Sequence, residues 1–255
     1  MQMKRIQQGV LGLLLLVGLS ACSDGGGDVP TPAPVSLPAT SAEGFWAGTT
    51  NTNRTVTGLV LDDGTYWVLY SAENAPLTVA GLIQGDSTSQ NGAITSSNAK
   101  DFNFETGKIL DATITGNYTM KQSLSGTLVY SIGGPSTSFT TTYDSDYDLV
   151  PDMNTVAGTY SGPVTATENV TVQVTSTGNL SGNSTTGCTF TGSFSPRTHG
   201  NVFNVTVLFE DDPACSNRND TVNGVGTYDA DTQTLYSAAL NGDRTNGFIF
   251  VGTKP

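Results

Sequence analysis

Apolar and polar residues alternate with a period of two in many segments that follow residue 42. Val170, Val172 and Val174 fall on one face of such a segment, whose other face carries threonine and glutamine. Residues 203–209 repeat the alternation with phenylalanine and valine. This period is typical of a β-strand that has one buried and one solvated face. The chain is therefore predicted to be all-β.

The C-terminal part of the chain contains a series of strand-like segments, separated by residues that favour turns. Eight such segments open near Val156, Val170, Asn179, Cys188, Val202, Thr221, Thr234 and Phe248. Turn sequences between neighbours, such as residues 176–178 and 241–243, favour an up-and-down order. Short antiparallel strands leave no exposed edge when they close into a barrel. We predict small antiparallel up-and-down β-barrels, with β-sandwiches as the alternative because the same alternation serves both.

An internal repeat divides the strand-rich part of the chain. The sequence GFWAG at 44–48 recurs as GTYSG at 158–162, an offset of 114 residues. The same offset aligns residues 56–57 with 170–171 and Gly64 with Gly178. Repetition at one spacing indicates a duplicated structural unit. We predict two tandem β-barrel domains, at residues 43–149 and 154–255.

The first 42 residues follow a different pattern. Lys4 and Arg5 precede an apolar run at residues 10–19, and small residues follow that run. This arrangement is typical of a secretory signal peptide, and the run is too short to be a transmembrane helix. Residues 23–42 are rich in glycine and proline and contain almost nothing that could be buried. We predict a signal peptide at residues 1–21 and a disordered tether at residues 22–42.

The sequence Leu19-Ser20-Ala21-Cys22 resembles the lipobox of bacterial lipoproteins. The resemblance implies that Cys22 becomes the first residue of the mature protein and carries lipid on its sulfur, with fatty acids such as palmitate. Several acyl chains give stable anchoring, so the membrane partner is reached through Cys22. In this family an aspartate after the cysteine favours the inner membrane. Ser23 stands there, which implies the outer membrane of the cell envelope.

The first predicted strand also carries a resemblance. Gly44-Phe45-Trp46 is similar to the opening of lipocalins and avidins, in which the tryptophan plugs one end of a small barrel. The similarity covers five residues, and Tyr160 replaces the tryptophan in the second repeat. It implies barrels that can enclose one small ligand.

The charge balance restricts the possible partners. The chain has 10 Lys+Arg against 22 Asp+Glu, a formal net charge of −12. Loss of Lys4 and Arg5 with the signal peptide leaves 8 against 22, a charge of −14. Nucleic acid is therefore not an expected partner, and attraction to anionic lipid head groups is disfavoured.

The chain has three cysteines. With Cys22 assigned to lipid, Cys188 and Cys215 form an even pair in an oxidising compartment. We predict a Cys188–Cys215 disulfide with a structural role.

Catalytic chemistry has little support in the sequence. His199 is the only histidine, and it lies in a predicted turn. Conventional nucleophile, phosphate-binding and zinc-protease motifs are not visible. The chain is therefore predicted not to be an enzyme.

A calcium site is one hypothesis for the junction between the domains. The alternate carboxylates Asp144, Asp146 and Asp148 could hold calcium, which prefers oxygen ligands. The spacing departs from an EF-hand, because Leu149 and Thr155 replace its glycine and glutamate. A solvated acidic linker is the alternative, and no other cofactor is expected.

Residues 65–70 are apolar on both faces of a predicted strand. Tyr66 and Tyr70 share one face, and Trp67 lies on the other. Aromatic side chains are common at interfaces, so these three residues form a candidate contact surface. The alternative is packing between the two domains or under a loop.

Together these patterns predict a non-enzymatic, outer-membrane-anchored lipoprotein with a macromolecule-binding or structural role in the envelope. A small-ligand carrier of the lipocalin type is the first alternative, and a protease or lysozyme inhibitor is the second. The sequence leaves the protein or small-molecule partner unidentified.

Overall fold

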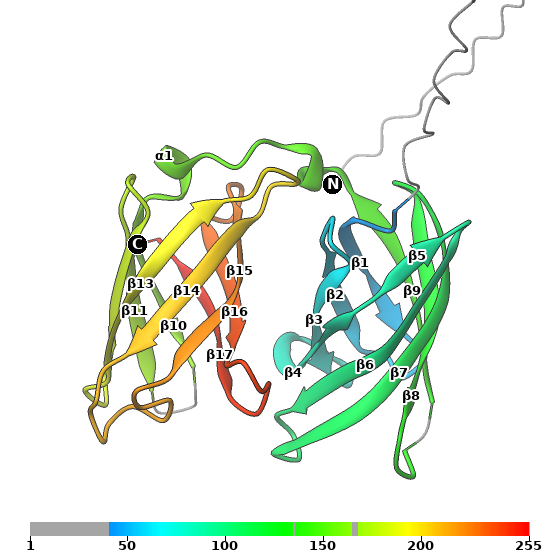
Figure 1. Ribbon diagram of the computed structural model, residues 1–255, viewed down its shortest axis with the longest axis horizontal. Helices are drawn as coiled ribbons and strands as arrows, with labels where there is room; N and C mark the ends of the chain where they lie inside the picture. Colours follow the sequence, from blue (N-terminus) through cyan, green and yellow to red (C-terminus); the bar gives the residue numbers. More distant parts are fainter. Residues whose placement is uncertain (1–40, 135, 165–167, 255) are drawn as a thin grey trace, which may run out of the picture. The chain divides into compact units, whose positions relative to one another are not determined.

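A computed structural model of the chain describes residues 41–134, 136–164 and 168–254. These residues form two antiparallel β-barrels (Figure 1). The predictions of an all-β fold and of two tandem up-and-down barrels are confirmed, and closure of the sheets distinguishes them from sandwiches. Among the described residues, no helix is long and apolar enough to cross a lipid bilayer.

Barrel 1 is built from the first nine strands. They are β1 (Gly44–Thr50), β2 (Thr55–Val60), β3 (Thr65–Ala72), β4 (Ala75–Asp86), β5 (Thr88–Gln90), β6 (Ala93–Asn103), β7 (Lys108–Thr119), β8 (Ser123–Tyr130) and β9 (Thr137–Asp144). Sequence neighbours pair, except that β4 pairs with β6 and the short β5 pairs only with β6. β1 also pairs with β9, and the pairing of β4 with β6 closes the sheet into a barrel.

Barrel 2 contains the remaining eight strands. They are β10 (Gly158–Pro163), β11 (Asn169–Val174), β12 (Asn179–Ser184), β13 (Thr189–Pro196), β14 (Phe203–Phe209), β15 (Thr221–Asp229), β16 (Thr234–Leu240) and β17 (Gly247–Thr253). Each strand pairs with its sequence neighbour, and β10 pairs with β17. Each of these eight strands begins within two residues of the position predicted from the sequence. The short helices η1 (Ser145–Asp148) and α1 (Met153–Val156) connect the barrels.

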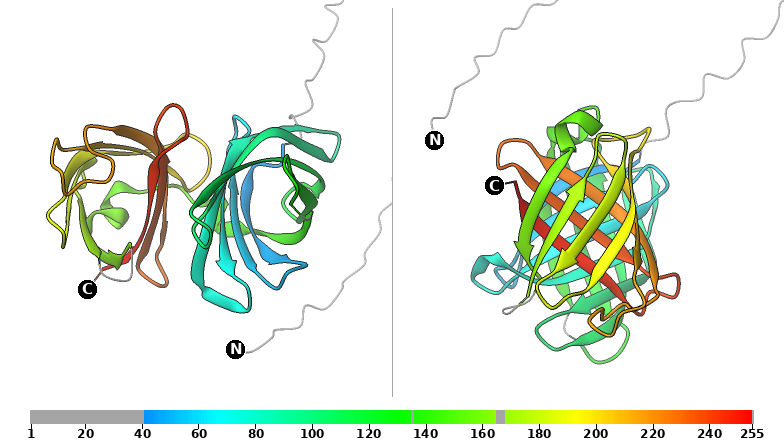
Figure 2. Two further views of the ribbon diagram at one scale, coloured as in Figure 1. Left: turned by 90° about the horizontal axis from the view of Figure 1, so that it is seen from below. Right: turned by 90° about the vertical axis from the view of Figure 1, so that its left-hand side faces the viewer.

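Figure 2 shows the two barrels in two further views. The period of two in the sequence sets which side chains enter each barrel. In β11, Val170, Val172 and Val174 are buried, whereas the residues between them are partly or fully exposed. In β14 the buried positions are Phe203, Val205, Val207 and Phe209. The apolar face of each strand therefore faces the interior, as the alternation predicted.

The two barrels begin with the same local contact. The Trp46 indole nitrogen donates to the Ala42 carbonyl oxygen at 2.9 Å. The Tyr160 hydroxyl donates to the Val156 carbonyl oxygen, which also lies four residues earlier. In each barrel, a hydrogen bond from an aromatic side chain thus connects the first strand to the segment that precedes it.

The turn after the second strand is also repeated. Gly64 and Gly178 both have φ near 86°, a conformation in which a side chain would be strained. A Cβ at Gly64 would lie 2.3 Å from the Ser87 carbonyl oxygen, and one at Gly178 would lie 2.5 Å from that of Phe194. The close backbone approach requires glycine in both barrels.

Candidate functional site

The interior of barrel 1 contains a cavity of about 290 Å³. Strands β2 and β3 form one wall, where Gly58 of β2 is paired with Val68 of β3. Apolar side chains from around the barrel complete the lining: Val56, Val60, Val68, Ile83, Ile94, Ile114, Leu124, Leu128 and Phe139. The cavity is therefore mainly apolar, as ligand sites inside small barrels usually are.

Trp46 closes one end of this cavity. Its side chain is 1% exposed, and its ring meets that of Tyr143 edge to face with centroids 5.5 Å apart. Thr50 and Thr52, at the end of β1 and in the turn that follows, line the opposite end, which we call the mouth. The cavity thus runs from an aromatic floor to a polar mouth.

Two tyrosines of β3 lie across the cavity wall because glycines face them. Tyr66 is paired with Gly85 of β4, and Tyr70 is paired with Gly81. A Cβ at Gly81 would lie 2.1 Å from the Tyr70 hydroxyl oxygen, and one at Gly85 would lie 2.4 Å from that of Tyr66. The absence of side chains at these glycines lets both rings cross β4 and reach β6.

The hydroxyl groups of these tyrosines meet polar groups on β6. Tyr66 is hydrogen-bonded to Ser96, with 2.8 Å between the side-chain oxygens. Tyr70 donates to Asp101 Oδ1 at 2.8 Å, and Tyr130 of β8 donates to Asp101 Oδ2 at 2.7 Å. Asp101 is fully buried. The buried carboxylate therefore has a hydroxyl donor on each of its oxygens.

Burial dominates the ionisation of this cluster. It raises the pKa of Asp101, while the hydrogen bonds from Tyr130 and Tyr70 act in the opposite direction. Burial and the neighbouring carboxylate together raise the pKa of both tyrosines above the ordinary value. Burial also raises the pKa of Tyr66 to about 12. The tyrosines are thus neutral donors at physiological pH.

Arg54 connects the cluster to the mouth. Its guanidinium donates to the Ser71 carbonyl oxygen at 2.9 Å and to Glu105 Oε2 at 2.8 Å. The guanidinium carbon also lies 5.6 Å from the centroid of the Tyr70 ring. Because Glu105 neutralises the arginine, the charge at this part of the mouth is paired within the protein.

The interior of barrel 2 differs, because aromatic side chains fill it. Phe194 and Phe203 are 1% exposed and stack with ring centroids 4.7 Å apart. Phe190, Phe209 and Phe250 belong to the same buried cluster as Tyr160 and the inward valines. Packing of this kind stabilises a domain and leaves little room for a ligand.

A more open hollow of about 420 Å³ lies at one end of barrel 2. Phe190, Phe209 and Phe248 line it from barrel 2, and Leu82 and Phe102 line it from strands β4 and β6 of barrel 1. The inward residues Val170 and Ser184 also line it, so this hollow enters one end of the barrel 2 interior and opens beside barrel 1. The cavity of barrel 1, by contrast, is lined by residues of that barrel alone, and it is the candidate functional site.

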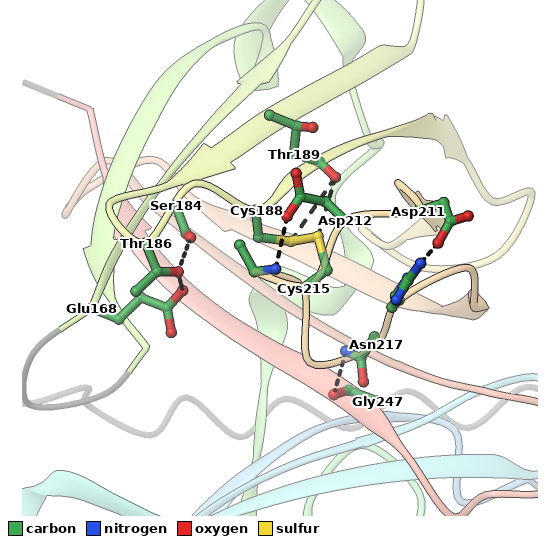
Figure 3. The surroundings of a disulfide bond; sticks show 12 residues. Glu168, Ser184, Thr186, Cys188, Thr189, Asp211, Asp212, Cys215, Asn217 and Gly247 are labelled. Atoms are coloured by element: carbon green, nitrogen blue, oxygen red, sulfur yellow. Dashed lines mark hydrogen bonds and ion pairs between the residues drawn. A yellow bond between two sulfur atoms is a disulfide. The ribbon is translucent and has the colours of Figure 1, made fainter.

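The disulfide predicted from the sequence is confirmed and lies at the same end of barrel 2 (Figure 3). Cys188 precedes β13, and Cys215 lies in the loop between β14 and β15. In that loop the Asn217 side-chain nitrogen donates to the Gly247 carbonyl oxygen at 3.1 Å. The disulfide and this bond fasten a long loop to the barrel, which is a structural role.

Tyr66, Trp67 and Tyr70, the candidate contact surface, are all buried, which agrees with the alternative of packing between the two domains or under a loop. The two tyrosines line the barrel 1 cavity. Trp67 points outward and packs in an apolar cluster with Leu240 and Val225 of barrel 2. Residues 65–70 are thus apolar on both faces because one face meets the cavity and the other meets the second barrel.

Polar contacts accompany this apolar cluster between the barrels. Arg197 pairs with Asp62 at 2.7 Å. Arg244 donates to the carbonyl oxygens of Gln84 in β4 and, at 2.9 Å, Asn98 in β6. These are the strands whose pairing closes barrel 1, and their ladder ends at Gln84. Arg244 therefore supplies hydrogen bonds where the two strands separate.

Two of the three predicted calcium ligands have other partners. Asp144 accepts a hydrogen bond from the backbone nitrogen of Asp146 and caps η1. Asp148 pairs with Lys121 at 2.6 Å and accepts from the Tyr143 hydroxyl at 2.9 Å. Asp146 is exposed. In residues 41–134, 136–164 and 168–254, no group of three or more His, Cys, Asp or Glu side chains is placed to hold a metal ion.

His199 lies in an exposed bend between β13 and β14. Cys22, together with the predicted signal peptide and tether through residue 40, lies outside the described residues.

The most informative site residues were not identified from the sequence. Asp101, Tyr130 and Arg54 are far apart along the chain and gave no local motif. One available signal was Asp101 itself, an acidic residue at an inward position of β6. Buried carboxylates need partners, so such a position indicates donors on neighbouring strands.

Comparison of the sequence with protein-family models and with curated proteins finds no match.

Proposed function

We propose that the chain is a carrier or receptor for a small, largely apolar ligand, which binds inside barrel 1. The observation that carries this proposal is the cavity of about 290 Å³ between Trp46 and the mouth. Its volume lies near the lower end of the range for ligand pockets, roughly 300–1,000 Å³. The filled interior of barrel 2 supports a structural role for that barrel.

Tryptophan fluorescence can test binding directly. The chain has two tryptophans, and only Trp46 lines the cavity. In the Trp67→Phe variant, the neutral apolar dye N-phenyl-1-naphthylamine should quench Trp46 emission by energy transfer and saturate at one dye per chain. Absence of saturable quenching by this dye would contradict the proposal.

A pair of matched variants locates the bound dye. Ile114 lines the cavity, whereas Ile109 on the same strand is 41% exposed. Ile114→Phe places extra volume in the cavity and should weaken dye binding about tenfold or more, a loss of about 1.4 kcal/mol. Ile109→Phe makes the same chemical change outside and should leave the affinity unchanged. Equal effects of the two changes would place the dye elsewhere.

The cellular location is part of the same proposal. A lipid on Cys22 would anchor the chain in the outer membrane, with the barrels held off the surface by the tether. Labelling with a palmitate analogue should mark the native protein and not the Cys22→Ser variant. Incorporation that survives this change would contradict the anchor.

A macromolecular partner is the second candidate, favoured by exposed apolar side chains near the mouth. Leu77 of β4 is 98% exposed, and Ile132 in the turn between β8 and β9 is 92% exposed. Exposed apolar groups of this size can mark a binding surface. A partner cross-linked to the native chain in envelope extracts should be lost from a Leu77→Ser, Ile132→Ser double variant that still binds dye.

A further inference from the structure

Given the ligand-binding function proposed above, we infer that the cavity of barrel 1 selects an uncharged apolar ligand that donates a hydrogen bond. Asp101 sets this selectivity by fixing the direction of the hydrogen bonds that Tyr70 and Tyr130 can make. The ligand class is therefore an apolar alcohol, a phenol or a related neutral donor.

The charges at the cavity are already paired, which disfavours an ionic ligand. Arg54 is neutralised by Glu105, and both oxygens of Asp101 accept hydrogen bonds from tyrosines. Glu73 also lines the mouth, but it is exposed, so water and salt screen it. A charged ligand would lose its hydration to an apolar wall without gaining a free counter-charge.

The hydroxyl protons of two lining tyrosines point away from the cavity. A tyrosine hydroxyl has a single proton, and Tyr70 and Tyr130 each direct it to the buried carboxylate of Asp101. Only lone pairs of their oxygens remain for another partner. Both residues line the cavity, and Tyr130 is only half-buried. A ligand that meets these oxygens must therefore bring the donor.

The arrangement also fixes the orientation of the ligand. Tyr130 is the last residue of β8, and Arg54 precedes β2, so this polar region belongs to the mouth. At the other end, Trp46 and the aliphatic side chains around it are apolar, and the hydroxyls of Tyr66 and Ser96 are hydrogen-bonded to each other. The apolar body should therefore lie toward Trp46 and the donor toward Tyr130.

Four probes of similar shape separate charge from hydrogen-bond direction. They are 2-naphthol, 2-methoxynaphthalene, 2-naphthoate and 2-naphthylmethylamine, whose affinities can be measured by calorimetry on the full chain at neutral pH. One hydrogen bond to a neutral partner predicts that 2-naphthol binds about 3- to 10-fold tighter than its methyl ether. The anionic and cationic probes should bind about tenfold more weakly than 2-naphthol, or worse.

Variants of the cluster test whether Asp101 is responsible. In Asp101→Asn the side-chain amide can donate to one tyrosine hydroxyl, which frees that proton to face the cavity. The preference for 2-naphthol over the ether should then fall to about twofold or less. Tyr130→Phe should reduce the preference by removing one acceptor. Tyr143→Phe is the matched control, because the Tyr143 hydroxyl bonds to Asp148 outside the cavity lining.

The outcomes separate this inference from the proposed function. If 2-naphthol and its ether bind equally tightly to the native chain, or if Asp101→Asn leaves their ratio unchanged, the inference is wrong and the carrier function stands. Tightest binding of 2-naphthoate or of the amine would also overturn it. If none of the probes, nor the dye, binds in the cavity, the proposed function fails and the inference fails with it.

Discussion

The two barrels have the same antiparallel strand topology, and they differ in the side chains that occupy the interior. Both are closed by eight antiparallel strands and begin with an aromatic side chain bonded to a carbonyl four residues earlier. Barrel 1 encloses a cavity, whereas stacked phenylalanines occupy barrel 2. The strand topology alone therefore does not determine whether a small barrel can hold a ligand.

The difference depends on the chemistry of the inward aromatic residues. Both barrels place aromatic rings over glycines: Tyr70 lies over Gly81 in barrel 1, and Phe194 lies over Gly226 in barrel 2. The tyrosine hydroxyl needs a polar partner when buried, and Asp101 supplies it. The phenylalanine ring has no such need and packs against other rings. Tyrosine thus accompanies a cavity with a buried polar cluster in its wall, and phenylalanine accompanies stacking of rings in the interior.

The largest expected effect is the loss of an aromatic ring from barrel 2. Phe194→Ala removes a fully buried ring and should lower the free energy of unfolding by about 3–5 kcal/mol. Ile114→Ala in barrel 1 should cost only about 1 kcal/mol, because the Ile114 side chain already faces a cavity. Chemical denaturation followed by far-ultraviolet circular dichroism measures both losses. Similar losses for the two variants would contradict the difference between the interiors.

The disulfide provides a second way to separate the barrels. Replacing both Cys188 and Cys215 by serine opens a loop with a sequence separation of 27 residues and should destabilise barrel 2 by about 3 kcal/mol. Both tryptophans lie in barrel 1, so fluorescence follows that barrel while circular dichroism follows both. The dichroism transition should move to lower denaturant, and dye affinity should be retained. Loss of dye binding in the folded variant would show that the cavity depends on the disulfide.

Much of this fold could be predicted because its signals are local. The alternation of Val170, Val172 and Val174 set the inward face of β11, and the eight strand positions followed from turn residues. The repeat at an offset of 114 residues placed the second barrel. These features depend on residues close together in the chain, where spacing determines geometry.

The candidate site could not be predicted because its contacts join distant strands. Asp101 meets Tyr70 and Tyr130, which are 31 and 29 residues away. Alternation identified the inward face of β3 but not whether the opposite wall would fill the space. The same limit explains why Trp67 was assigned to a contact surface, since its partners Val225 and Leu240 belong to the other barrel.

A smaller effect is expected where barrel 2 contacts the closure of barrel 1. Arg244→Ala removes hydrogen bonds to the Gln84 and Asn98 carbonyls and should cost about 1–2 kcal/mol. Hydrogen exchange should increase for amides of β4 and β6 near these residues. Arg197→Ala, which removes the contact with Asp62, is the control and should leave those amides protected. Equal exchange in the two variants would argue against a specific role for Arg244.

The smallest effect concerns the charge inside barrel 1. The folded-state pKa of Asp101 is raised, so above the ordinary aspartate value of about 3.9 the native state holds its proton more tightly than the unfolded state does. The contribution of this group to stability is therefore fully present at low pH and declines as the pH rises through its folded-state pKa. The unfolding free energy of Asp101→Asn minus that of the native chain should therefore increase between acid and neutral pH. Denaturation of both proteins across this range measures the difference. A decrease would mean that the tyrosine donors outweigh burial, so that the carboxylate is stabilised inside the barrel and the direction of its pKa shift is reversed.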